Sequence, residues 1–125
     1  MIITIQRQYG SSGEKIGELL AQRLDIAYFD KEIPTVASKE SNIEEKVCKT
    51  YDEMFVNTGI YSLLPDAQAA KAAGYRQPLA ERVYLAEFNA IRKLAKEQSG
   101  VFVGRCSDYI LKEYANAVHF LFMHQ

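Results

Sequence analysis

The chain has 125 residues, of which 48% are hydrophobic and 25% charged, and its formal net charge is −1. This composition is ordinary for a globular protein and excludes a disordered or fibrous chain. Because no block of like charges occurs, the charge balance favours binding neither to nucleic acid nor to a membrane surface.

Targeting and cysteine patterns indicate the compartment. The N-terminus "MIITIQRQ" lacks the basic and long apolar segments of a signal peptide, and no apolar run has the length of a membrane span. Cys48 and Cys106 have no CxxC spacing, so neither a disulfide framework nor a zinc site is predicted. We therefore expect a protein of the reducing cytoplasm, without a metal site built from its own side chains.

The first thirty residues predict a strand, a glycine turn, a helix and a second strand. Ile2–Ile5 is a short β-branched run, and 26–29 is another that ends at Asp30. Ser11 and Glu14 have the spacing of a capping box, which places the helix start inside the glycine loop. Four apolar side chains recur at helical spacing, namely Ile16, Leu19, Leu20 and Leu24. The pattern is a βαβ unit and implies a parallel sheet.

The middle of the chain is predicted to be helical. Residues 31–39 form a short helix with Pro34 in its first turn. Ser41 and Glu44 match a second capping box. The stripe of the next helix consists of Ile43, Val47, Tyr51 and either Met54 or Phe55. Residues 57–77 have no clear pattern.

The last third predicts a long helix and two more strands. The helix begins at Pro78 and stops near Gly100, which suits a C-terminal cap. One of its faces carries Tyr84, Phe88, Ile91 and Ala95. A strand (101–103), a short helix (107–114) and a strand (118–123) follow. The fold class is therefore α/β, a parallel sheet flanked by helices. The sequence stops without a helix to cover the last strand, so we expect the N-terminal part of a longer protein.

The glycine loop is the first candidate site. "GSSG", Gly10 to Gly13, lies between a strand and a helix, where backbone N–H groups converge on an anion. The GxxxxGK[ST] signature is not met, because Glu14 and Lys15 follow Gly13. Two alternatives stay open, a tight turn without ligand and a dinucleotide loop in which Asp30 holds a ribose, although GxxGxxxG is not the usual spacing.

The second candidate site is the "GR" turn that follows the third strand. Arg105 leaves the strand at the carboxyl edge of the sheet, where open α/β folds bind ligands, and its planar fork suits a phosphate. A structural ion pair between Arg105 and Asp108 is the alternative. For Asp30 the alternative is a cap on the helix that follows it.

Four blocks together resemble the cytidylate kinase-like family, a branch of the P-loop nucleoside-monophosphate kinases. They read, in order, "ITIQRQYGSSGEKIGELLAQRLDIAYFDKEI", "SKES", "PLAERVYLAEFNAIRKLA" and "VFVGRCSDYILKEYANAVHFLFM". The resemblance implies a P-loop kinase fold that uses ATP and Mg²⁺ and phosphorylates a nucleoside monophosphate such as CMP or dCMP.

The resemblance also implies roles for residues. Gly10, Ser11, Ser12 and Gly13 would wrap the ATP phosphates together with Lys15. Lys15 and Arg105 would neutralise charge during catalysis, while Asp30, Arg105 and Asp108 would position the acceptor. Residues 41–82 would be a helical acceptor-binding insert in a single, partial kinase domain of residues 1–125.

Two departures from the family pattern leave a second hypothesis open. Acidic Glu14 stands where a basic residue is expected after the glycines, and the sequence stops before the arginine-bearing lid of such kinases. A catalytically impaired nucleotide- or anion-binding regulatory module is therefore the alternative to an active kinase, with a nicotinamide-dependent oxidoreductase as a third reading. A chain that ends on a strand also invites pairing, so a homo-oligomer is one expectation.

Overall fold

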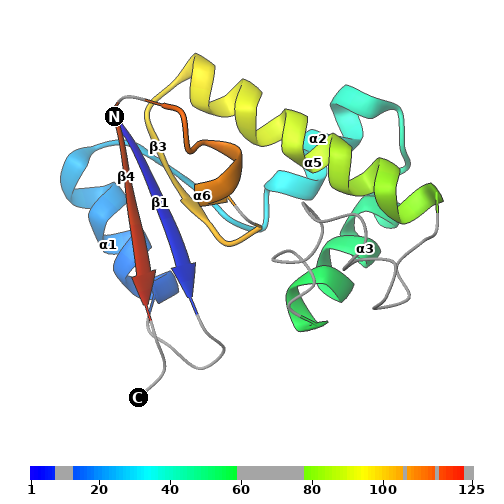
Figure 1. Ribbon diagram of the computed structural model, residues 1–125, viewed down its shortest axis with the longest axis horizontal. Helices are drawn as coiled ribbons and strands as arrows, with labels where there is room; N and C mark the ends of the chain where they lie inside the picture. The colour runs from blue at the N-terminus through cyan, green and yellow to red at the C-terminus, as the bar shows by residue number, and fades with distance from the viewer. Residues whose placement is uncertain (8–12, 59–77, 106, 115, 123–125) are drawn as a thin grey trace. The chain divides into compact units, whose positions relative to one another are not determined.

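The protein, shown as a computed structural model in Figure 1, consists of two compact units. The structure describes residues 1–7, 13–58, 78–105, 107–114 and 116–122. One unit comprises Met1–Asp30 and Ile91–Gln125, and the other comprises Lys31–Ala90. The elements in chain order are β1 (Ile2–Arg7), α1 (Gly13–Leu24), β2 (Ala27–Phe29), α2 (Ile33–Ser41), α3 (Glu45–Thr58), α5 (Pro78–Glu97), β3 (Gly100–Val103), α6 (Ser107–Ile110) and β4 (Ala117–Phe122).

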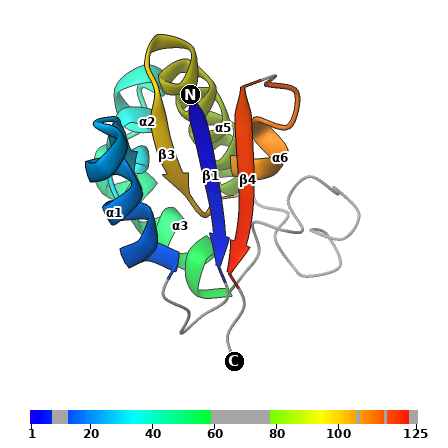
Figure 2. The same cartoon turned by 90° about the vertical axis from the view of Figure 1, so that its left-hand side faces the viewer.

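The first unit is built on a four-stranded parallel sheet in the order β2-β3-β1-β4. The register pairs Ile3 of β1 with Val101 on one side and with Val118 on the other. Helix α1 lies on one face of this sheet and α6 on the other (Figure 2). The α/β fold with a parallel sheet is thus confirmed. The run of buried β-branched residues explains it, because central strands of a parallel sheet are covered on both faces.

Helix α1 packs through its small residues. Gly13, Gly17 and Ala21 are buried, whereas Leu19 is 56% and Leu24 43% exposed. A Cβ built on Gly17 would lie only 3.0 Å from Ile5 Cδ1, so the helix approaches the sheet too closely for a larger side chain. The apolar stripe predicted for this helix is therefore not its buried face, because Leu19 and Leu24 are exposed. The leucines share one face of the helix, but the face that packs against the sheet is the neighbouring one, which carries Gly13, Gly17 and Ala21.

Two predicted helix termini differ from the structure. Helix α5 ends at Glu97, and Gly100 is the first residue of β3, buried against Phe29. A Cβ there would be 2.8 Å from the Phe29 ring, so packing rather than capping requires the glycine. Ser41 Oγ donates to the Ala37 carbonyl at 2.6 Å, so Ser41 completes the last turn of α2 instead of capping α3. The predicted cap at Ser11 lies outside the described residues.

The second unit contains α2, α3 and the first part of α5. Pro34 lies in the first turn of α2, as predicted. Phe55 is fully buried while Met54 is 37% exposed, which decides between the two alternatives for the α3 stripe. Residues 59–77 lie outside the described part of the chain, and their assignment to an acceptor-binding insert stays a prediction. In the described residues, no helix has the length and apolar character needed to cross a bilayer.

Candidate functional site

The carboxyl edge of the sheet brings together three segments that are distant in sequence. Strand β1 ends where the glycine loop begins, β2 ends at Asp30, and β3 ends at the turn of Gly104 and Arg105. The Gly104 N–H donates to the Ile5 carbonyl at 2.8 Å, which holds this turn against β1. Helices α1 and α6 leave the neighbouring strands β1 and β3 on opposite faces (Figure 2). Two adjacent strands whose following helices lie on opposite faces form a topological switch point, and open α/β sheets bind ligands at the carboxyl ends of such strands.

The turn that carries Arg105 has an unusual backbone. Gly104 has a φ of 69° and Arg105 a φ of 56°, both in the left-handed region. For a residue with a Cβ this conformation costs about 1–2 kcal/mol. Backbone strain of this kind concentrates at functional sites, where the surrounding structure enforces it. The strained position of Arg105 therefore marks the turn as a candidate site on grounds other than sequence.

Arg105 forms a buried ion pair with Asp30. Arg105 Nη1 donates to Asp30 Oδ1 at 2.6 Å, and the two side chains are 5% and 6% exposed. The same nitrogen donates to the Val103 carbonyl at 3.0 Å. Asp30 does not cap the next helix, because Glu32 occupies the N-cap position of α2. The pair joins residues that are 75 positions apart in the sequence, a contact that neither local alternative predicted.

Asp108 reaches the same edge from α6. Its Oδ1 accepts a hydrogen bond from Gln6 Nε2 at 2.8 Å. Gln6 belongs to the end of β1, next to the segment that leads into the glycine loop. Sequence reasoning did not select Gln6, because a lone glutamine in a strand carries no pattern. The structure thus brings Asp30, Arg105 and Asp108 to one edge.

Tyr28 is a further residue of this edge that sequence reasoning missed. Its hydroxyl oxygen is 3.4 Å from the Glu14 carbonyl and 3.4 Å from Asp30 Oδ2. Burial raises the pKa of Tyr28 above its ordinary value, and the charges of Asp30, Glu14 and Glu18 raise it further. The hydroxyl therefore keeps its proton at neutral pH. The alternation of side chains in extended backbone could have indicated it, since Tyr28 precedes Asp30 by two residues, a spacing that puts both side chains on the same side.

The predicted nucleotide loop is described only at its end. Gly10, Ser11 and Ser12 lie outside the described residues, while Gly13 is the buried first residue of α1. Glu14 is half-buried in the first turn, and Lys15 is exposed. The N-terminus of a helix attracts anions, whether a phosphate or a carboxylate such as that of Glu14. The roles of these residues stay predictions.

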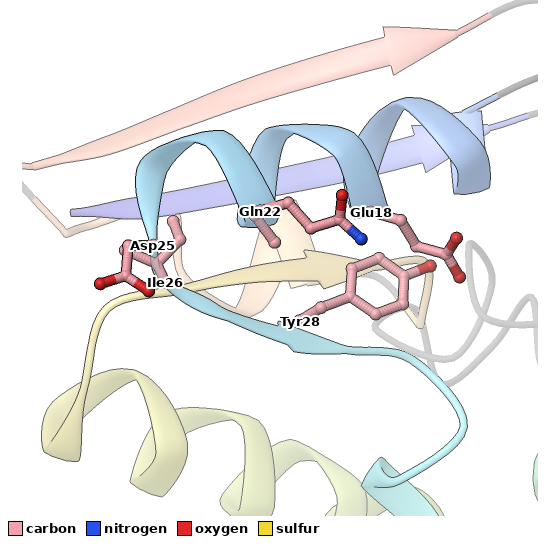
Figure 3. Close-up of a pocket in the computed structure, with 6 residues that line it drawn as sticks. Glu18, Gln22, Asp25, Ile26 and Tyr28 are labelled. Carbon is pink, nitrogen blue, oxygen red and sulfur yellow. The ribbon is translucent and has the colours of Figure 1, made fainter.

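A cavity of about 410 Å³ adjoins α1 and β2 (Figure 3). Its described lining consists of Glu18, Ala21, Gln22, Asp25, Ile26 and Tyr28. Two carboxylates, Glu18 and Asp25, make it unfavourable for a phosphate by like-charge repulsion. The described residues also contain no group of three or more acidic, histidine or cysteine side chains that could hold a metal ion. The cavity is therefore a poorer candidate than the edge around Arg105.

Comparison with known proteins indicates a family and supports the fold. The model of the cytidylate kinase-like family matches residues 2–124. A comparison with curated proteins gave no significant match. Among solved structures, an uncharacterized protein from Eubacterium ventriosum ATCC 27560 is similar, with a TM-score of 0.55 and 23% identity over 98% of this chain and 53% of that chain. This likeness supports the fold, and the chain spans about half the length of that neighbour.

The chain belongs to the cytidylate kinase-like family, as nearly its whole length matches the family model.

Proposed function

We propose that this member of the cytidylate kinase-like family is a nucleotide kinase that transfers the γ-phosphoryl group of ATP to a nucleoside monophosphate, CMP or dCMP. The observation that carries the proposal is the buried Arg105–Asp30 pair on a left-handed turn, next to the strand end where the glycine loop begins. A guanidinium held in this way presents a fixed fork that suits a phosphate.

In the proposed reaction, an oxygen of the acceptor phosphate attacks the γ-phosphorus of ATP, and ADP leaves with the electrons of the broken bond. The protein contributes positioning and charge stabilisation rather than covalent chemistry. The backbone of Gly10–Gly13 and the ammonium of Lys15 bind the phosphates of ATP. Arg105 binds the acceptor, and Asp108 orients it from the start of α6.

Asp30 acts on the acceptor through Arg105 in this proposal. Its Oδ1 accepts from Arg105 and its Oδ2 faces the Tyr28 hydroxyl, so both oxygens have protein donors nearby. A carboxylate would also repel an acceptor phosphate at contact distance. The role of Asp30 is therefore to fix the direction of the guanidinium.

Magnesium fits this site as an ion that arrives with ATP. Mg²⁺ in kinase sites is held mainly by substrate phosphates and water, with one or two protein ligands. When bound, the ion neutralises charge that develops on the phosphate oxygens.

A second function is supported by Glu14. Its carboxylate stands in the first turn of α1, where it competes with phosphate for the same N-terminal N–H groups. A protein with this arrangement would bind nucleotide weakly and serve as a regulatory module without turnover. Glu14→Ala should then tighten ATP binding in calorimetry without producing ADP release.

A coupled assay of ADP release with the full-length protein distinguishes the two functions. CMP, dCMP, UMP, AMP and GMP are offered as acceptors. We expect turnover with CMP or dCMP, and no turnover with any acceptor would refute the kinase function. Arg105→Lys keeps the charge but loses the fork, and we expect kcat/KM to fall about 100-fold. Arg23→Lys, at an exposed arginine in the last turn of α1, is the matched control.

A further inference from the structure

Gln6 lies at a well-fixed position near the end of β1, the strand between β3 and β4. Its backbone pairs with Leu121 of β4, so the sheet holds it from the side. Side chains alternate between the two faces of a strand. Ile5 faces α1, because a Cβ built on Gly17 would lie 3.0 Å from Ile5 Cδ1. The side chain of Gln6 therefore points to the opposite face, where α6 lies (Figure 2).

Asp108 lies in the first turn of α6, whose backbone is anchored. Ser107 and Leu111 are fully buried at the two ends of this turn. The Ser107 N–H donates to the Gly104 carbonyl at 3.0 Å, and the Leu111 N–H donates to the Ser107 carbonyl at 2.9 Å. Asp108 itself is half-buried. A helix of four residues fixes the Cα of Asp108, and contacts of the side chain itself must orient its carboxylate.

The hydrogen bond from Gln6 supplies such a contact. Gln6 Nε2 donates to Asp108 Oδ1 at 2.8 Å, across 102 residues of sequence. A hydrogen bond to a carboxylate is stronger than one between neutral groups. The amide of a glutamine carries no charge, so it orients the carboxylate without neutralising it. A carboxylate offers roughly four acceptor positions, and the bond to Gln6 uses one of them.

We propose that Gln6 is a positioning residue that fixes the Asp108 carboxylate toward a donor group of the acceptor nucleotide. The inference rests on the proposed function, in which Arg105 binds the acceptor phosphate and Asp108 orients the acceptor. A carboxylate repels a phosphate at contact distance, so Asp108 accepts from an O–H or N–H group of the nucleoside part. Gln6 touches no substrate and acts through Asp108.

Calorimetry of CMP binding tests this role. Gln6→Met keeps the length of the side chain and removes its donor, and we expect the Kd of CMP to rise about tenfold. In the coupled assay of ADP release, the KM for CMP should rise while the KM for ATP stays constant, because only the acceptor meets Asp108. Gln22→Met, at an exposed glutamine of α1, is the matched control and should change neither constant.

A double variant shows whether Gln6 acts through Asp108. In Asp108→Ala no carboxylate is left to orient, so adding Gln6→Met should weaken CMP binding no further. Effects of the two substitutions that add would show that Gln6 acts by another route, which overturns the inference. A merely structural role of Gln6 would lower stability in both backgrounds without this dependence on Asp108.

The second test needs no nucleotide. Exchange of the side-chain amide protons with solvent is followed by NMR in the ¹⁵N-labelled protein. We expect one Nε2 proton of Gln6 to exchange more slowly than those of the exposed Gln22, and this difference to vanish in Asp108→Ala. Equal exchange of the two glutamines in the unmodified protein would overturn the inference, because Gln6 would not hold the carboxylate in solution.

The outcomes separate this inference from the proposed function. If CMP binds and reacts but Gln6→Met leaves its Kd unchanged, the inference is overturned and the kinase function stands. If no acceptor turns over but CMP binds and Gln6→Met weakens it through Asp108, the kinase function fails and the positioning of the nucleotide stands. If CMP does not bind the unmodified protein, both fail. Where Gln6→Met does not fold, Gln6→Ala replaces it in each measurement.

Discussion

Substitution of Asp30 by asparagine tests the buried ion pair directly. The pair is 2.6 Å long and its side chains are 5% and 6% exposed, so solvent screens it little. Removal of one partner of a buried pair destabilises a protein by about 3–5 kcal/mol, because the remaining charge stays buried. The asparagine side chain would still offer an oxygen to Arg105. We therefore expect a loss of about 3 kcal/mol, at the lower end of that range.

Urea unfolding followed by far-UV circular dichroism measures this loss. The midpoint should fall at an unchanged m-value, which shows that stability changed rather than compactness. Glu45→Gln is the matched control, since Glu45 pairs with Lys49 at 3.8 Å and both side chains are about half exposed. An exposed pair of this spacing contributes only about 0.3–0.5 kcal/mol.

The double substitution Asp30→Leu with Arg105→Met shows how much of the loss in Asp30→Asn comes from the unpaired charge of Arg105. With both charges gone, no uncompensated charge is buried, so the double variant should be more stable than Asp30→Asn. A loss for Asp30→Asn as small as that for Glu45→Gln would refute the reasoning. It would mean that water or another group compensates Arg105 and that the pair does not fix the arginine.

Three further predictions concern other features of the chain. Gly104→Ala should cost about 1–2 kcal/mol in urea unfolding, because its φ of 69° strains an alanine although no atom lies within 4 Å of the new Cβ. Gly17→Ala should destabilise by about 1–3 kcal/mol despite alanine's helix propensity, because its Cβ would crowd Ile5 and Tyr28. Cys48 should make stability fall at alkaline pH. Burial and then the charges of Glu87, Asp52 and Glu45 raise the pKa of its thiol, so above about pH 8.5 the unfolded chain binds fewer protons than the folded one. The slope reaches at most about 1.4 kcal/mol per pH unit, and Cys48→Ala should abolish it.

Each of these predictions has a result that would contradict it. A Gly104→Ala variant as stable as the unmodified protein would show that the turn is not strained. A stabilising Gly17→Ala would show that α1 can move away from the sheet at little cost. If the unmodified protein and Cys48→Ala lose stability in parallel between pH 7 and pH 10, the thiol does not contribute to the alkaline loss.

The sheet was predictable because its signals are local. Three strands, β1, β2 and β3, follow from short apolar runs bounded by turns, and the helix between the first two implies their parallel direction. The faces of the helices were less predictable. Leu19 is exposed to solvent because α1 packs against Ile5 through Gly17. The spacing of hydrophobic residues does not show where two backbones approach so closely that only a small residue fits between them.

The sequence by itself determined the fold class and the chemistry offered at the strand ends, since those depend on residue types at short spacing, and its resemblance to a known family indicated the family. It identified Arg105 and Asp30 separately, each with a local alternative. Only the tertiary structure decided that they are partners, because a pairing across 75 residues depends on strand order and register. The same closure of the sheet placed Tyr28 beside Asp30 and Glu14, and held the turn of Arg105 against Ile5 of β1.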